Sequence, residues 1–179
     1  MRTFTKQAEV MPAVRPDREE CYETRWGVGR LLLADGMPLQ HDLPDETRRA
    51  PVGDGVPPSA WRGLLERYFA GEAVAFALDV SRYARVYGCT TFETAVLRAL
   101  AAVPYGHPVS YRDLAVAAGY PNAYRAVGSV MARNRLPVVL PCHRVIKNDG
   151  RLGEFGGDPA WKARLLALEG YVPRGVERS

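Results

Sequence analysis

The chain carries its most reactive side chains in the stretch LPCHRVI, which spans residues 140–146. The apolar run before it predicts a buried strand over 138–140, ended by a turn at Pro141. A neighbouring base or cation converts a thiol into the nucleophilic thiolate, so Cys142 beside His143 is a candidate nucleophile with its base. Adjacent strand residues point to opposite faces, so the pair cooperates only if the turn folds the imidazole back or a water relays the proton. A structural cysteine is the alternative, since free cysteines are among the most buried residues.

The composition of the 179 residues is that of a soluble globular protein, with 47% hydrophobic and 25% charged residues. No run is long and apolar enough to span a membrane, and the N-terminus does not resemble a secretory signal. Three widely spaced cysteines predict reduced thiols, so we expect a cytoplasmic or nucleoid-associated protein that is not secreted. No CxxC or HxxxH spacing supports a zinc site, and we expect no metal and no cofactor.

The net charge of +4 is unevenly distributed along the chain. Residues 1–100 carry 13 Lys and Arg against 14 Asp and Glu, whereas residues 101–179 carry 11 against 6. The basic excess lies in the part that contains Cys142, which favours a polyanionic partner. A solvated basic face is the plainer alternative.

Composition and the positions of turn-forming residues divide the chain into three parts. Residues 1–20 are predicted to form an N-terminal arm, 21–89 an α/β scaffold domain and 90–179 a mainly helical C-terminal domain. The scaffold shows no motif with chemistry of its own. Its first expected elements are strands at 31–34 and 37–43, joined by an Asp35-Gly36 hairpin turn, and Pro38 makes the second of them an edge or irregular strand. A helix from the Ser59 cap to Phe69, a strand at 73–80 and a connection at 81–90 are expected to follow.

Apolar residues at helical spacing, together with capping residues, predict helices along most of the C-terminal part. The helices expected there begin at Thr90 or Thr91, at Ser110 with Asp113 as a capping-box partner, at Asn122 and at about Pro159, and the last three end near Ala118, Arg133 and Glu169. The two short helices around a glycine-containing turn are a candidate helix-turn-helix, for which a structural helical hairpin is the alternative. A carboxylate at a helix C-terminus is either solvated or held by a partner such as a protonated imidazole.

Small residues dominate the second helix of this pair, at positions 123, 126, 128, 129 and 132. They allow close approach to another helix or to nucleic acid, and Arg125 stands among them as a long cation. A solvated arginine is the simpler interpretation. Glycines across 148–157 mark a loop whose backbone can approach a ligand closely, or a plain connection.

Several short motifs recur together in one known family. They are VPYG at 103–106, VSY at 109–111, RAVG at 125–128, Asn134, PCHRVI at 141–146 and LLALEG at 165–170. With them the chain resembles the O6-alkylguanine-DNA alkyltransferases, also called methylated-DNA–protein-cysteine methyltransferases. The resemblance is close over about 90–171 and weaker over 22–80, and it does not include 1–20.

The resemblance implies a small N-terminal α/β domain, RNase H-like with antiparallel strands, before a helical domain that binds DNA and transfers the alkyl group. It implies a DNA repair protein that flips O6-alkylguanine out of duplex DNA and moves the alkyl group irreversibly to Cys142. The expected partner is double-stranded DNA contacted in its minor groove by a monomer, with O4-alkylthymine left open as a second substrate.

The resemblance also implies roles for individual residues. Cys142 is the acceptor thiolate, His143 the base acting through a water, Glu169 the support of the imidazolium, Asn134 the holder of the turn and Tyr111 a hydrogen-bond donor to guanine. The implied substrate contacts are Val145, Gly156, Met131 and Phe155, and the implied DNA contacts are Arg125, which replaces the flipped base, Ala126, Tyr124, Ser110 and Gly128.

Four positions depart from the family pattern: Tyr124 and Glu154 stand where small residues are commoner, Arg135 replaces a proline, and Gly156 replaces a side chain found in some members. None removes a catalytic group. Three rival functions remain open: a non-catalytic alkylated-DNA lesion-binding protein of the same fold, a Cys-His hydrolase and a transcription factor.

Overall fold

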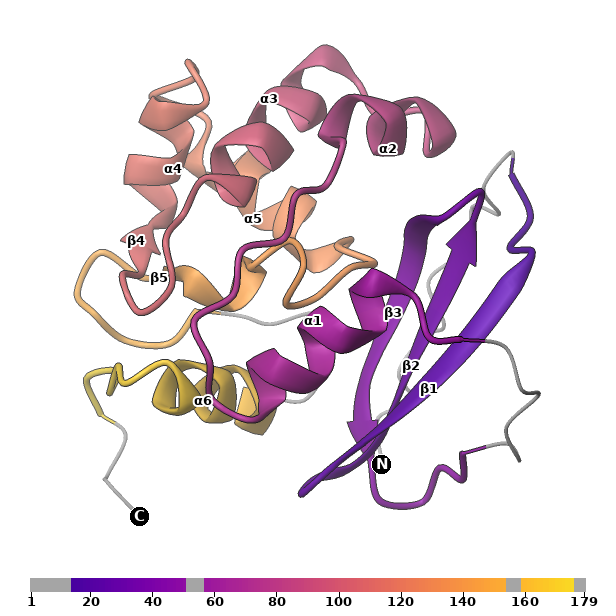
Figure 1. Cartoon of the computed structure of the whole chain (residues 1–179). Coiled ribbons are helices and arrows are strands. Elements are labelled where there is room, and N and C mark those ends of the chain that lie inside the picture. Colours follow the sequence, from indigo (N-terminus) through magenta and orange to yellow (C-terminus); the bar gives the residue numbers. More distant parts are fainter. Residues whose placement is uncertain (1–13, 51–56, 154–158, 176–179) are drawn as a thin grey trace, which may run out of the picture.

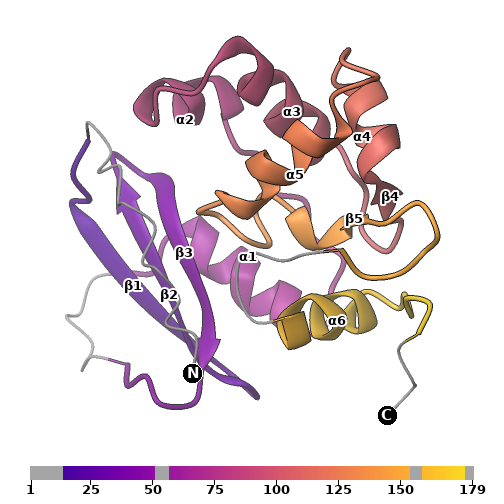
Figure 2. The same cartoon turned by 180° about the vertical axis from the view of Figure 1, so that it is seen from behind.

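A computed structural model describes residues 14–50, 57–153 and 159–175 (Figure 1). Within these ranges, three antiparallel strands form a sheet in the order β1-β2-β3, and the rest contains six α-helices, a 3-10 helix and a two-stranded parallel sheet of β4 and β5. Figures 1 and 2 show α1 between this sheet and the remaining helices. The elements are β1 (Arg18–Thr24), β2 (Gly27–Ala34), β3 (Met37–Asp45), α1 (Ala60–Phe69), α2 (Val80–Val86), α3 (Thr91–Ala101), β4 (Val109–Ser110), α4 (Tyr111–Ala117), α5 (Tyr124–Ala132), the 3-10 helix η1 (Cys142–Arg144), β5 (Val145–Ile146) and α6 (Pro159–Leu168).

The hairpin between β2 and β3 is confirmed. Asp35 and Gly36 both have positive φ, 48° and 70°, and Ala34 pairs with Met37 across the turn. Two positive φ values match the twist of the flanking strands, and Asp-Gly tolerates them best. The register shifts beside Pro38 in the edge strand β3, where proline lacks the N–H that a ladder hydrogen bond needs.

One predicted boundary and one predicted strand in the N-terminal part are wrong. The arm expected over 1–20 overlaps β1, which already begins at Arg18, and residues 1–13 of that arm lie outside the described part of the chain. The expected strand at 73–80 is irregular up to Asp79, which instead caps α2 by accepting a hydrogen bond from the backbone N–H of Arg82. Residues 74–78 do alternate between core and surface, but their backbone bonds are local, such as Val80 N–H to Leu78 O, and do not form a ladder. An alternation of buried and exposed residues indicates an extended segment with one buried face. It does not show that a neighbouring strand is present to pair with that segment.

The helical part follows its predicted caps with one exception. Thr90 with Glu93, and Ser110 with Asp113, form complete capping boxes at α3 and α4. For α5 the predicted cap Asn122 is wrong, because Ala123 occupies the cap position and makes no side-chain cap bond. The pair α4 and α5, joined by the turn around Gly119, provides the expected helix-turn-helix arrangement.

The apolar run before Cys142 is a buried turn, so the predicted strand at 138–140 is also wrong. The Leu140 N–H bonds Leu136 O at 2.8 Å, and Val138 has a φ of +75°. A left-handed β-branched residue is strained and persists only where its surroundings fix it. Burial, which needs no strand pairing, accounts for the hydrophobicity of this run.

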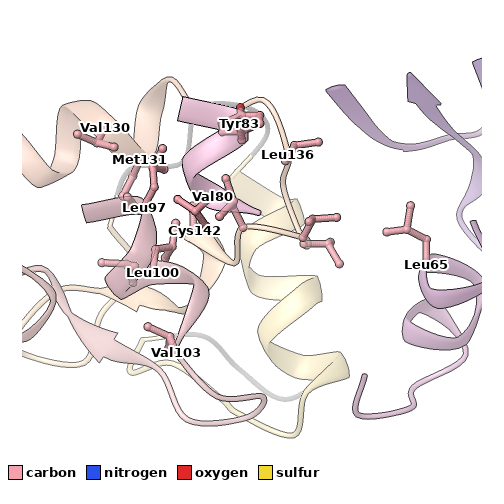
Figure 3. Packing of buried hydrophobic residues seen from close by; sticks show 14 of the residues in the cluster. Leu65, Val80, Tyr83, Leu97, Leu100, Val103, Val130, Met131, Leu136 and Cys142 are labelled. Carbon is pink, nitrogen blue, oxygen red and sulfur yellow. The ribbon is translucent and has the colours of Figure 1, made fainter. Parts of the chain in front are cut away.

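The core is continuous from the sheet to the reactive turn. Figure 3 shows Cys142 in one apolar cluster with Met131 of α5 and Leu97 of α3, and Leu65 of α1 belongs to the same cluster. Among the described helices, none combines the length and the hydropathy that crossing a bilayer requires.

Candidate active site

Asn134 and the backbone of the strained turn hold Cys142. The residue is only 5% exposed and lies at the start of η1. The Asn134 side-chain amide donates to Cys142 Sγ at 3.0 Å and to Leu140 O at 2.8 Å, and its oxygen accepts from Leu136 N–H. One side chain therefore fixes both ends of the turn and the sulfur.

His143, the next residue, is fully buried and points to a carboxylate. Its Nε2 lies 2.6 Å from Glu169 Oε1, whereas its Nδ1 has no hydrogen-bond partner within the described part of the chain. Because a carboxylate can only accept, Nε2 carries the proton, and Nδ1 has a lone pair available as a base. The orientation is that of an imidazole prepared to receive a proton at Nδ1.

Glu169 follows the last residue of α6, and its carboxylate accepts hydrogen bonds from four residues, among them His143 and Tyr68. Arg144 donates to both carboxylate oxygens from Nε, and the Gly106 N–H donates to Oε2 at 3.0 Å. Burial alone would raise the pKa of Glu169, but the hydrogen bonds and charges of His143 and Arg144 lower it to about 2. Of the two sequence alternatives, the carboxylate held by partners is therefore the correct one.

The resting site keeps its nucleophile and its base neutral. Burial raises the pKa of the Cys142 thiol, against the lowering effects of the Asn134 hydrogen bond and the Lys162 charge. Burial likewise lowers the pKa of His143, and Glu169 opposes this. The thiol thus stays protonated until something draws its proton toward the imidazole.

The structure describes three of the predicted substrate-side residues, which are Tyr111, Met131 and Val145. Tyr111 begins α4 and closely approaches Gly153, where a Cβ would stand 2.5 Å from its hydroxyl oxygen. Met131 is buried on the inner side of α5. The backbone carbonyl of Val145, a residue that the resemblance implies as a substrate contact, accepts a hydrogen bond from Lys162 Nζ at 2.6 Å. Phe155 and Gly156, like Glu154, lie outside the described residues.

The predicted DNA contacts fall into two groups. Tyr124, Arg125 and Ala126 are exposed at the start of α5, where the Arg125 guanidinium lies 5.9 Å from the Tyr124 ring centroid. Ser110 is buried and caps α4, and Gly128 is half-buried against the Tyr111 ring. The exposed group is available to a partner, whereas the other two have structural contacts inside the domain.

Sequence reasoning gave no role to three residues that complete the site. Arg144 stood in a quoted motif, and Lys162 is a buried lysine whose pKa burial lowers to about 8. Its spacing with Leu165, Leu166 and Glu169 places it on the inner face of α6 and could have identified it. Tyr68 of α1 donates to Glu169 Oε1 at 2.7 Å, and no motif connects it with residue 169.

In fold and site, the chain is a protein with a buried cysteine, imidazole and carboxylate in a helical part that also contains the helix pair α4 and α5. A family model described as "6-O-methylguanine DNA methyltransferase, DNA binding domain" matches residues 91–171. The methylated-DNA–protein-cysteine methyltransferase of Mycolicibacterium paratuberculosis is 40% identical over 148 residues, 79% of this chain and 87% of that protein. The chain therefore belongs to the methylated-DNA–protein-cysteine methyltransferase family, as its motifs predicted.

Further relatives agree in family and differ in how much of each protein is matched. The Haemophilus influenzae protein of the same name is 35% identical over 85% of this chain and 88% of its own length. The constitutive Bacillus subtilis protein is 45% identical, but the match spans only 61% of its length and 59% of this chain. A crystal structure of Mycobacterium tuberculosis OGT in complex with DNA superposes with a TM-score of 0.66 at 29% identity, over 85% of this chain and 92% of that one.

Proposed function

We propose that this chain repairs DNA by transferring the alkyl group from the O6 atom of guanine to Sγ of Cys142, once per protein molecule. The observation that carries the proposal is the buried thiol fixed by Asn134 beside an imidazole whose other nitrogen is bound to Glu169. Base, nucleophile and orienting acid are the groups that an activated cysteine needs.

The chemistry balances without a cofactor. The thiol proton passes through a water to His143 Nδ1, and Glu169 stabilises the imidazolium that results. The thiolate attacks the alkyl carbon and the carbon–O6 bond breaks, with its electron pair going to guanine, which leaves as an anion hydrogen-bonded by Tyr111. That anion then takes up a proton from water, and the imidazolium of His143 returns its proton to water. The product is a thioether on Cys142, and because a thioether does not hydrolyse under physiological conditions, the protein is consumed.

We propose that α5 makes the main contacts with DNA. An O6-alkylguanine stacked in a duplex cannot reach the thiol of a residue that is 5% exposed, so the nucleotide must be flipped out. Arg125 then fills the gap in the stack, and the small residues of α5 let the helix approach the narrow minor groove. The partner is accordingly double-stranded DNA that carries the alkylated base, bound by a monomer.

A reaction with excess alkylated duplex separates the rival functions. We expect one equivalent of O6-methylguanine to be repaired per protein molecule, with no further product on longer incubation. A Cys-His hydrolase would continue past one equivalent, and a lesion-binding protein would bind the duplex and repair none. Either outcome would overturn the proposal.

A further inference from the structure

Tyr68 reaches the active site from a part of the chain that the motifs treat as scaffold. It lies on α1, its side chain is fully buried, and its hydroxyl is 2.7 Å from Glu169 Oε1 and 3.2 Å from His143 Nε2. The ring is packed against that of Phe69 and lies 6.3 Å from the His143 ring, between centroids. The hydroxyl is thus directed at the shared contact of the imidazole and the carboxylate.

The directions of these hydrogen bonds follow from the chemistry of the three groups. Burial, together with the Glu169 charge, keeps the pKa of Tyr68 well above its ordinary value, so the hydroxyl keeps its proton. An ionised carboxylate can only accept, so Tyr68 and His143 Nε2 both donate to Oε1. The hydroxyl also offers its own oxygen to the Nε2 proton, and both contacts favour the tautomer that leaves Nδ1 as the base.

We propose that Tyr68 is a positioning residue of the alkyl-transfer reaction, acting through Glu169 on the orientation and basicity of His143. The inference rests on the proposed function, since it concerns the same site. It gives α1, and with it the N-terminal part of the chain, an indirect role in the reaction through the residues that activate the thiol. Tyr68 does not touch the substrate or the sulfur.

A purely structural role for this hydroxyl is a weaker explanation. Glu169 keeps donors from Arg144, Gly106 and His143 when the Tyr68 hydroxyl is removed, so its charge stays satisfied. Tyr105 provides the comparison, because its ring lies 6.0 Å from that of Tyr68 and its hydroxyl donates to a backbone carbonyl, Leu168 O at 3.1 Å. The two tyrosines share surroundings and differ in whether the acceptor is the carboxylate.

The experiment compares the wild type, Tyr68→Phe and Tyr105→Phe in single-turnover reactions with free O6-benzylguanine across pH. Tyr68→Phe should react about tenfold more slowly at neutral pH, the size expected for one lost hydrogen bond to a charged group. Its activity should also begin at higher pH, because Oε1 without the hydroxyl attracts the imidazolium more strongly and raises the pKa of His143. The charged or titratable groups around that imidazole are Glu169, Arg144, Lys162, Cys142 and Tyr68.

Tyr105→Phe should follow the wild-type profile. Either of two results for Tyr68→Phe would overturn the inference. One is a rate–pH profile identical to that of the wild type, and the other is a slower reaction with the same pH dependence, which would mean that Tyr68 affects the rate only through packing. Thermal unfolding of both variants shows whether each is folded. If the wild type itself does not react with benzylguanine or with alkylated DNA, the proposed function fails, and this result is distinct from failure of the inference.

Discussion

At the scale of single residues, the site depends on side chains whose hydrogen bonds permit one arrangement. His143 bonds a carboxylate through Nε2, and Asn134 uses its amide for both the sulfur and the turn. The sequence predicted these roles through a resemblance to a family. It could not predict Tyr68 or the buried contact of Lys162 with Val145 O, because both depend on how α1 and α6 pack.

Asn134→Ala should slow the reaction with free O6-benzylguanine by about tenfold and lower the free energy of unfolding by about 2 kcal/mol. The variant loses the donor to the thiol, which raises the thiol pKa further, and it leaves Leu140 O and Leu136 N–H without their partner. Single-turnover kinetics and denaturant unfolding measure the two effects. Asn122→Ala is the matched control, at an exposed position before α5, and equal rates for the two variants would contradict the role of Asn134.

At the scale of elements, local signals predicted the structure where local chemistry determines it. The Asp35-Gly36 hairpin, the Ser59 cap of α1 and the two capping boxes all depend on residues within a few positions of one another. The predictions failed where hydrophobicity was taken as evidence of strand pairing. Residues 73–79 and 138–140 are buried in part or fully without a partner strand, and only the tertiary fold decides whether a partner is present.

At the scale of the whole molecule, the sheet is attached to the reactive turn as well as to the core. His41 of β3 bonds Pro137 O through Nδ1 at 2.6 Å, and its backbone N–H bonds Arg135 O. A carbonyl only accepts, so Nδ1 carries the proton and Nε2 accepts from the Tyr22 hydroxyl at 2.5 Å. Together with Tyr68, this contact makes the N-terminal part a support for the turn that carries Cys142.

Acid should weaken this attachment. Burial lowers the pKa of His41 to about 4 from an ordinary 6.5, although the Pro137 hydrogen bond opposes the shift. Because the pKa of His41 is lower in the folded state than in the unfolded state, the stability that neutral His41 contributes is complete above pH 6.5. That stability is lost as the pH falls toward 4. The pKa shift corresponds to about 3 kcal/mol of the free energy of unfolding.

Denaturant unfolding between pH 7 and pH 4 measures that loss. The wild type should lose stability through this range, and His41→Asn, already less stable at pH 7, should lose less. His107→Asn, at an exposed position, controls for replacing a histidine. Parallel curves for the wild type and His41→Asn would contradict the assignment.

The sulfur of Cys142 is the atom that receives the alkyl group in the proposed reaction. After reaction with duplex DNA containing O6-methylguanine, the protein is digested and the masses of its cysteine peptides are measured. We predict a gain of one CH2 unit on the peptide that contains Cys142 and none on those with Cys21 or Cys89, although both of these are more exposed. An unmodified Cys142 peptide from protein that has repaired the DNA, or a modification at either other cysteine, would contradict the account.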